Sequence, residues 1–217
     1  MTVCRLGPIA VQYTAIVAAS NAWMTREVNG VVLIGGRSRR MGQPKQSLAF
    51  RGSTLTEAVV RALQPHVARV VLAGSGPVPE ALEMLERLAD PPDVAGPMAG
   101  VAAAMRWSPE SAWIVAACDM PRISAEAIRW LTEQRRPDAW AVLPRSRAGN
   151  VEALLAVYEP QARPLIEAQI ADGRWGLHHL TDHDHVSSPT IPTELAEAWT
   201  NVNTPEELRN EELGIRN

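Results

Sequence analysis

The sequence of 217 residues has few cysteines, few aromatic rings and almost no excess of charge of either sign. Its two cysteines, Cys4 and Cys118, match no metal-ligand spacing, so we expect no cysteine-based metal site and a cytoplasmic location. Aromatic residues make up 5% of the chain, and burial explains the tryptophans among them better than base stacking. A net charge of −3 gives no positive field for a phosphate backbone, so no nucleic-acid partner is expected.

The sequence also lacks an apolar run of the length that spans a bilayer, which takes about 20 residues. The most apolar N-terminal stretch, residues 7–19, is short and is interrupted by Gln12, so we expect no membrane partner. Three alternatives remain for residues 1–27: a signal peptide, an N-terminal extension, or a start assigned too early with Met24 as the true start. The absence of a small-residue cleavage pattern disfavours the signal peptide. We predict one domain over residues 28–217.

What the chain does contain is an ordinary globular composition, with 46% apolar and 21% charged residues. From residue 31 onward, apolar runs alternate with amphipathic segments, which predicts an α/β fold: a single doubly wound, mostly parallel sheet with helices on both faces, similar to a Rossmann fold. We expect strands over residues 31–34, 70–73, 113–117, 140–143 and 152–158. We expect helices from residue 53 or 54, over residues 79–88, 100–107, 124–135 and 161–170, and from residue 205.

A loop rich in glycine and in cations follows the first expected strand, over residues 33–45. Ligands of open α/β sheets bind at the carboxyl ends of the strands, so this loop is placed where a ligand would lie. Glycines let backbone N–H groups approach an anion, and cations balance its charge. The spacing matches neither a P-loop nor a dinucleotide fingerprint. A basic surface turn is the alternative, which the position directly after a buried strand disfavours.

Asp119 follows the third expected strand at the same edge of the sheet. A carboxylate there can hold a Mg²⁺ ion that bridges phosphates. The alternative is a turn or helix cap, although Ser124 is the better cap for the next helix. The neighbouring Cys118 is a poor candidate nucleophile, because a buried cysteine usually packs as a small hydrophobe. A metal site at His183 and His185 is disfavoured, since their spacing fits no common zinc motif.

Taken together, four segments resemble the molybdenum cofactor guanylyltransferases, within the nucleotidyltransferase superfamily of glycosyltransferase-A-like fold. The family pattern L-x-G-G, S-x-R-M-G and lysine stands at residues 33–45, and G-P-M-A-G stands at residues 96–100. C-D-M-P stands at residues 118–121, and N-V-N-T-P-E-E-L at residues 201–208. Two departures concern the substrate: Pro44 stands where the family often has an acidic residue, and Ala153 replaces the proline of an E-P-L segment.

This resemblance implies transfer of GMP from GTP to the phosphate of molybdopterin, with Mg²⁺ as cofactor and pyrophosphate as the second product. It also implies molybdoenzyme maturation proteins as further partners. The alternative is a related nucleotidyltransferase that uses CTP, UTP or ATP on another phosphorylated acceptor. A binding protein on the same fold, which would tolerate loss of Asp119, is a second alternative.

The resemblance also assigns roles to individual residues. The catalytic candidates are Lys45, Arg40 and Asp119. The nucleotide-binding candidates are Leu33, Ile34, Gly35, Gly36, Arg37, Ser38, Arg39, Met41, Gly42, Lys45, Gly96, Pro97, Gly100 and Asp119, with Asp90 and Asp93 as alternatives for one further contact. The acceptor-binding candidates are Asn201, Asn203 and Glu152. The metal candidates are Asp119 and Asn203.

Overall fold

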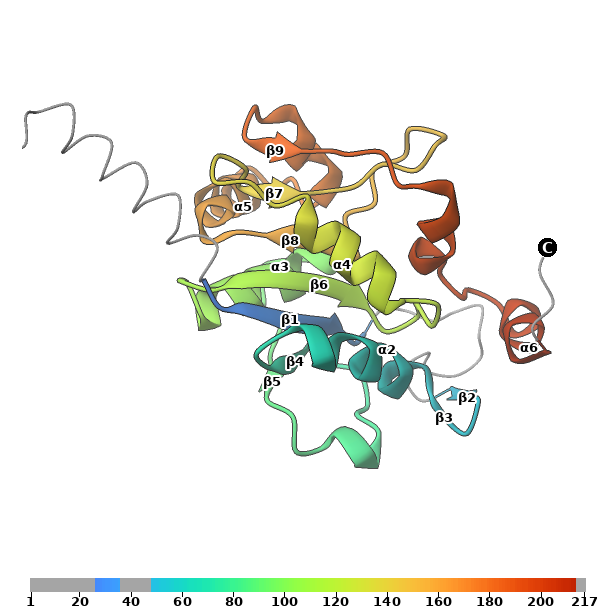
Figure 1. Cartoon of the computed structure of the whole chain (residues 1–217). Coiled ribbons are helices and arrows are strands. Elements are labelled where there is room, and N and C mark those ends of the chain that lie inside the picture. The colour runs from blue at the N-terminus through green and yellow to red at the C-terminus, as the bar shows by residue number, and fades with distance from the viewer. Residues whose placement is uncertain (1–25, 36–47, 214–217) are drawn as a thin grey trace, which may run out of the picture.

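The computed structural model describes residues 26–35 and 48–213, and a seven-stranded sheet forms its centre (Figure 1). The strands of this sheet are β1 (Val28–Leu33), β4 (Val70–Ala73), β5 (Arg87–Leu88), β6 (Ala112–Ala117), β7 (Ala141–Val142), β8 (Ala156–Tyr158) and β9 (Val186–Ser187). Their order is β5-β4-β1-β6-β8-β7-β9. Strand β8 runs antiparallel to both of its neighbours, and the other pairings within this sheet are parallel. The prediction of a mostly parallel α/β sheet is confirmed.

Helices cover both faces of the sheet. The α-helices are α2 (Leu55–Leu63), α3 (Pro97–Trp107), α4 (Ala125–Glu133), α5 (Arg163–Ala171) and α6 (Pro205–Leu213). Helices α2 and α4 pack on the face that carries Val32, while α3 and α5 pack on the face that carries Val31 (Figure 1). Successive strand residues point to opposite faces, so the continuous apolar run of β1 feeds both cores. In the described part of the chain, no helix has the length and apolar content that a membrane crossing requires.

Shorter elements complete the chain. A small hairpin is formed by β2 (Ala49–Phe50) and β3 (Ser53–Thr54). The 3₁₀ helices are Gln64–His66, Glu80–Leu82, Pro160–Ala162, Leu177–Asp182 and Thr193–Trp199. Phe50 packs with Leu48, Leu55 and Val202 in a third cluster beside the main core, which joins the hairpin to the C-terminal part of the chain.

Most expected elements are present, and local capping explains where two of the helices start. Helix α2 begins after Thr54, whose side chain accepts from the Glu57 N–H while the Glu57 carboxylate accepts from the Thr54 N–H. Helix α4 begins after Ser124, whose hydroxyl accepts from the Ala127 N–H at 3.2 Å, as predicted. Helix α3 starts at Pro97, earlier than the predicted residue 100, since proline suits the first helical position.

The helix predicted over residues 79–88 is wrong. The structure has only the 3₁₀ helix Glu80–Leu82 there, and the segment ends in strand β5. The Leu72 N–H donates to the Glu86 carbonyl at 2.9 Å, and the Gly74 N–H donates to the Leu88 carbonyl at 3.0 Å. These bonds satisfy the open edge of β4, and tertiary pairing of this kind overrides a weak local helical pattern.

The strand predicted over residues 152–158 is shorter than expected and runs antiparallel, as β8. Leu155 directly before it has a φ of +54°, so the chain bends there and residues 152–154 lie outside the ladder. Strand β9, which lies within the segment expected to be irregular, adds a parallel edge to β7. The helix predicted over residues 161–170 is present as α5 with a 3₁₀ turn before it.

A buried ion pair joins the end of α4 to the end of β8. The Arg135 Nε lies 2.6 Å from Glu159 Oε1, and the two side chains are 5% and 4% exposed. Because removal of one partner leaves a buried charge without compensation, we expect Glu159→Gln to lower the free energy of unfolding by about 3–5 kcal/mol. Urea denaturation measures this difference.

The matched control is Glu167→Gln. Glu167 accepts from Arg106 Nε at 2.8 Å and Nη2 at 2.7 Å, but this pair is about one-third exposed. Exposed pairs of this kind contribute about 0–1 kcal/mol, so the control is expected to change the free energy of unfolding little. Equal losses in the free energy of unfolding would contradict this account, because they would show that burial of the Arg135–Glu159 pair does not increase the cost of removing one partner.

Candidate functional site

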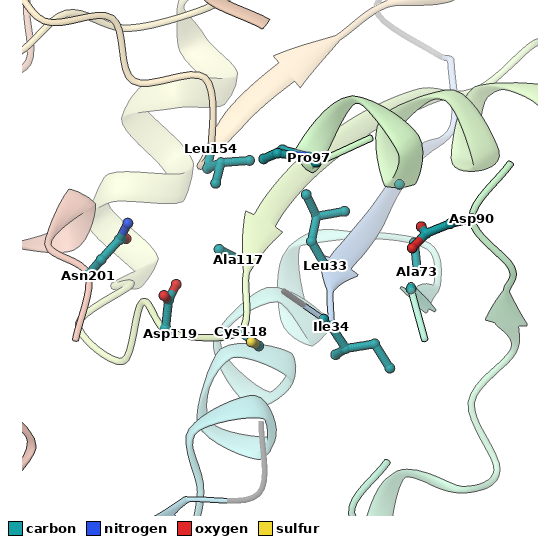
Figure 2. A pocket seen from close by; sticks show the side chains of 14 residues that line it. Leu33, Ile34, Ala73, Asp90, Pro97, Ala117, Cys118, Asp119, Leu154 and Asn201 are labelled. Carbon is teal, nitrogen blue, oxygen red and sulfur yellow. The ribbon is translucent and has the colours of Figure 1, made fainter. Parts of the chain in front are cut away.

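A pocket lies where β4, β1 and β6 end side by side (Figure 2). Leu33 pairs with Ala73 on one side and with Ala117 on the other, so the three carboxyl ends lie at one level. The pocket has a volume of about 340 Å³, within the usual range for small-molecule sites. Its lining residues are Leu33, Ile34, Gly35, Ala73, Gly74, Asp90, Gly96, Pro97, Gly100, Ala117, Cys118, Asp119, Leu154 and Asn201.

Apart from Asp93, the predicted catalytic and nucleotide-binding residues divide into two groups. The structure brings Leu33, Ile34, Gly35, Asp90, Gly96, Pro97, Gly100 and Asp119 together in this pocket. The candidates Gly36, Arg37, Ser38, Arg39, Arg40, Met41, Gly42 and Lys45 lie outside the described residues. The described chain leads to them from Gly35, at the pocket wall, and resumes at Leu48, so the roles of these loop residues stay predictions.

Hydrogen bonds between neighbouring strand ends shape the floor of the pocket. The Ile34 N–H donates to the Ala73 carbonyl at 2.7 Å, and the Cys118 N–H donates to the Leu33 carbonyl at 3.1 Å. The second bond fixes the start of the Asp119 loop directly beside the start of the glycine-rich loop. The described starts of the two segments singled out by the sequence are therefore neighbours in space.

The first turn of α3 closes one side of the pocket at Pro97 and Gly100. A Cβ atom at Gly100 would lie 2.5 Å from Leu33 Cδ2 and 3.3 Å from Ala73 Cβ, so glycine permits this close approach. The amino-terminal end of a helix favours negative charge through its dipole and its N–H groups. The amino-terminal end of α3 is thus suited to an anion, and nucleotide binding by Gly96, Pro97 and Gly100 stays a prediction.

Asp119 and Asn201 face the pocket from the opposite side (Figure 2). Asp119 is half-buried, and its backbone carbonyl accepts from the Val202 N–H at 2.8 Å, which ties the two segments together. Arg122 Nε also lies 2.6 Å from Glu211 Oε2 on α6. These contacts hold the segment around Asn201 against the loop that carries Asp119.

Three candidates lie outside the pocket lining. Asn203 is exposed, and its backbone N–H donates to Glu207 Oε2 at 2.6 Å at the start of α6. Glu152 is half-buried beside Leu154, its N–H donates to the Pro144 carbonyl at 2.7 Å, and burial raises the pKa of its carboxyl. Asp93 is exposed beyond the pocket edge. Of the two acidic alternatives for the nucleotide contact, the pocket therefore includes Asp90 and not Asp93.

Asp90 stands on the β5 side of the pocket. Partial burial raises the pKa of its carboxyl, and the nearby Arg87 guanidinium opposes this effect. Arg87 Nε donates to the Gly74 carbonyl at 3.2 Å, and Arg87 Nη2 donates to the Gly76 carbonyl at 2.8 Å. One arginine thus contacts the turn after β4 and influences the charge of Asp90.

Five residues that line the pocket were not among the site candidates from the sequence: Ala73, Gly74, Ala117, Cys118 and Leu154. Ala73 and Gly74 end a strand that was predicted, so the same argument from strand ends would have found them. Leu154 could not be found in this way, because it reaches the pocket only through the bend before β8.

The histidines of residues 183–185 do not line the pocket, and their rings contact a tryptophan. The His183 and His185 rings stack on Trp140, with centroid distances of 4.9 and 4.7 Å. His185 Nδ1 lies 2.9 Å from the Asp138 carbonyl. These contacts explain His183 and His185 as packing against Trp140, directly before strand β7.

Comparisons with known proteins agree with this geometry. The family model described as "MobA-like NTP transferase domain" matches residues 30–186. The "Probable molybdenum cofactor guanylyltransferase" of Bacillus mycoides is 29% identical over 197 residues, which cover 87% of this chain and 97% of the relative. The protein with the same name from Bacillus cytotoxicus is 28% identical over 84% of this chain and 94% of its own length.

Solved structures give the same result for the fold. The crystal structure of molybdopterin-guanine dinucleotide biosynthesis protein A from Archaeoglobus fulgidus superposes with a TM-score of 0.71 and 25% identity, covering 85% of this chain and 97% of that one. A cytidylyltransferase from Thermus thermophilus shares the fold at 18% identity, with a TM-score of 0.60 over 88% of this chain and all of that one. Since the family model matches well over half of the sequence, the chain belongs to the MobA-like NTP transferase family and is a nucleotidyltransferase.

Proposed function

We propose that this enzyme transfers GMP from GTP to the terminal phosphate of a molybdopterin, and releases pyrophosphate. The names of the relatives support this choice of substrates. The observation that carries it is the position of Asp119, which the bond from the Cys118 N–H to the Leu33 carbonyl holds beside the start of the glycine-rich loop. A carboxylate and an anion-binding loop at adjacent strand ends suit a nucleoside triphosphate with its metal.

The residues around Asp119 fit a Mg²⁺ ion. This ion is usually held by one or two carboxylates together with substrate phosphates, and needs no complete cage of protein ligands. Asp119 supplies one half-buried carboxylate at the pocket, and the Asn201 amide lies on the same side (Figure 2). When bound, Mg²⁺ neutralises phosphate charge and polarises the α-phosphate.

The two sides of the pocket suggest which substrate lies where. Asp90 and Ala73 lie on one side of the end of β1, while Asp119, Asn201 and Leu154 lie on the other (Figure 2). If the triphosphate lies between the ends of β1 and β6, the nucleoside extends toward Asp90 and the acceptor approaches from Asn201. We assign Asn201 to acceptor binding on this basis.

The chemistry requires positioning and charge stabilisation more than a base. A phosphate oxygen of the acceptor forms a bond to the α-phosphorus of GTP, and the bond from that phosphorus to the bridging oxygen of pyrophosphate breaks. The attacking oxygen is already anionic, so no proton has to be removed from it. Asp119 would hold the Mg²⁺ ion, which would supply positive charge beside the α-phosphate, and the cations of the loop would balance the charge of the leaving pyrophosphate.

Lys45 is the one lysine of the sequence, and we assign it to the triphosphate. Lys45→Ala removes a charge-assisted hydrogen bond, so we expect about a 10- to 100-fold loss in turnover or GTP affinity. Lys45→Arg is expected to rescue only part of this loss, since the guanidinium differs in shape and reach. Steady-state kinetics measure both variants.

Chemical modification gives an independent check on Lys45. Because the chain has no second lysine, reductive methylation modifies this side chain and the N-terminus alone. GTP with Mg²⁺ is expected to slow methylation of Lys45 and leave the N-terminus unprotected. If Lys45→Ala turned over normally and GTP did not protect Lys45 of the wild type, we would assign the triphosphate contact to Arg39 or Arg40 instead.

A thermal-shift comparison of the four nucleoside triphosphates, each with Mg²⁺, tests the proposed donor. A ligand that binds only the folded state raises the melting temperature in proportion to its affinity. GTP is expected to give the largest rise, and Asp119→Asn to reduce that rise. A larger rise with CTP, UTP or ATP would overturn GTP as the donor. We further propose that the reaction takes place in the cytoplasm, with molybdoenzyme maturation proteins as recipients of the product.

A further inference from the structure

One arginine of the edge strand β5 contacts both ends of the turn after β4. Arg87, on the edge strand β5, binds two carbonyls of this turn at once, that of Gly74 at 3.2 Å through Nε and that of Gly76 at 2.8 Å through Nη2. The Gly74 N–H donates to the Leu88 carbonyl at 3.0 Å. The β5 side thus fixes both carbonyls of the turn, while on the β1 side the Gly76 N–H donates to the Ile34 carbonyl at 3.5 Å.

The bond from Arg87 to the Gly74 carbonyl fixes the direction of the peptide group between Gly74 and Ser75. In a trans peptide the C=O and the following N–H point to opposite sides. Since Arg87 draws the Gly74 carbonyl toward β5, the Ser75 N–H points away from β5. The Ser75 nitrogen lies 3.8 Å from the position that a Cβ atom of Gly35 would occupy, and Gly35 lines the pocket.

We propose that Arg87 is a positioning residue that aims the Ser75 N–H at the nucleobase, where this amide donates to a ring carbonyl oxygen. The inference rests on the proposed function, which places the nucleoside on the Asp90 side of the pocket. Guanine carries such an oxygen at C6, whereas adenine carries an amino group there and cannot accept. A fixed amide donor therefore selects GTP over ATP without any side-chain contact to the base.

The geometry also separates this role from phosphate binding. Arg87 is absent from the pocket lining, and its two bonds go to the backbone beyond β4. Asp119 and the first turn of α3 contact the pocket from other elements. Removal of the Arg87 guanidinium should thus change how the base is bound and leave the binding of pyrophosphate unchanged.

The test uses the full chain with Arg87→Met, which keeps a similar stem and removes both hydrogen bonds, and Arg87→Lys, which keeps the charge. Arg106→Met is the matched control, because Arg106 also makes a bidentate contact but binds the exposed Glu167. Titration calorimetry with Mg²⁺ gives the dissociation constants of GTP, ITP, ATP and pyrophosphate. ITP retains the oxygen at C6 and lacks the 2-amino group of GTP.

We expect Arg87→Met to weaken GTP and ITP about tenfold, the size of one hydrogen bond or two, with ATP and pyrophosphate unchanged. Arg87→Lys is expected to fall between Arg87→Met and the wild type, and Arg106→Met to match the wild type. Equal weakening of all four ligands would mean a structural role only and would overturn the inference, as would unchanged selectivity for GTP over ATP in Arg87→Met. A wild-type chain without that selectivity would overturn the proposed function as well.

Discussion

Gly74→Ala is expected to disrupt the pocket and to destabilise the chain strongly. Gly74 has a φ of +124°, and a Cβ atom there would lie 1.8 Å from the Ile34 carbonyl oxygen and 2.9 Å from its carbon. Both contacts are with backbone, which cannot rotate away as a side chain could. A strained φ alone costs on the order of 1–3 kcal/mol, and the clash adds to it, so we expect a loss of about 3 kcal/mol or more in the free energy of unfolding.

The clash also reaches the site, because Ile34 and Gly74 both line the pocket. Either β1 or β4 must shift, and the strand ends that carry the glycine-rich loop and the turn after β4 separate. GTP binding is therefore expected to be lost even where the variant remains folded. Urea denaturation and calorimetry measure the two effects.

Gly149→Ala is the matched control for this variant. Gly149 has a φ of +85°, but a Cβ atom there would meet no atom within 4 Å. Its replacement thus carries the backbone strain without the clash, and is expected to lower stability less and to leave GTP binding intact. Similar losses in the two variants would show that the close approach of β1 and β4 is not what requires glycine at position 74.

Asp119→Asn is expected to abolish most of the turnover while the fold is kept. The substitution preserves the volume of the side chain and the backbone carbonyl that accepts from the Val202 N–H. It removes the carboxylate that would hold Mg²⁺ at the α-phosphate. Loss of one preorganised electrostatic contact to a transition state costs on the order of 100- to 1,000-fold in turnover, and we expect a loss of this size.

Two measurements separate this loss from unfolding. The melting temperature of Asp119→Asn is expected to stay near that of the wild type. Its residual turnover is expected to need a higher Mg²⁺ concentration than the turnover of the wild type. Asp172→Asn, at an exposed aspartate that pairs with Arg174 at 3.1 Å, is the control and is expected to behave as the wild type. Near-normal turnover in Asp119→Asn would remove Asp119 from the reaction.

The central strands and the positions of their ends could be predicted from the sequence. Runs such as residues 31–34 and 113–117 are apolar at every position, which is typical of strands covered on both faces. Their carboxyl ends meet at one edge, so the sequence alone predicts that Gly35 and Asp119 are neighbours. The pocket confirms that they line one cavity.

Tertiary pairing explains what the sequence could not show. Leu82, Leu85 and Leu88 repeat at a helical spacing, yet the edge of β4 recruits residues 87–88 as a strand. The direction of β8 and the bend at Leu155 depend on partners far away in the sequence, so the place of Leu154 in the pocket was not predictable. Arg87 was missed for the same reason, since its partners, Gly74 and Gly76, become apparent only once β4 and β5 pair.

The most direct test of the account is to incubate the purified chain with GTP, molybdopterin and Mg²⁺, and to measure pyrophosphate together with the nucleotide product by mass spectrometry. The account predicts equal amounts of pyrophosphate and of a molybdopterin–GMP conjugate, both dependent on each substrate and both lost in Asp119→Asn. Formation of a conjugate with CMP, UMP or AMP in preference to GMP, or no conjugate at all under conditions where GTP binds, would contradict it.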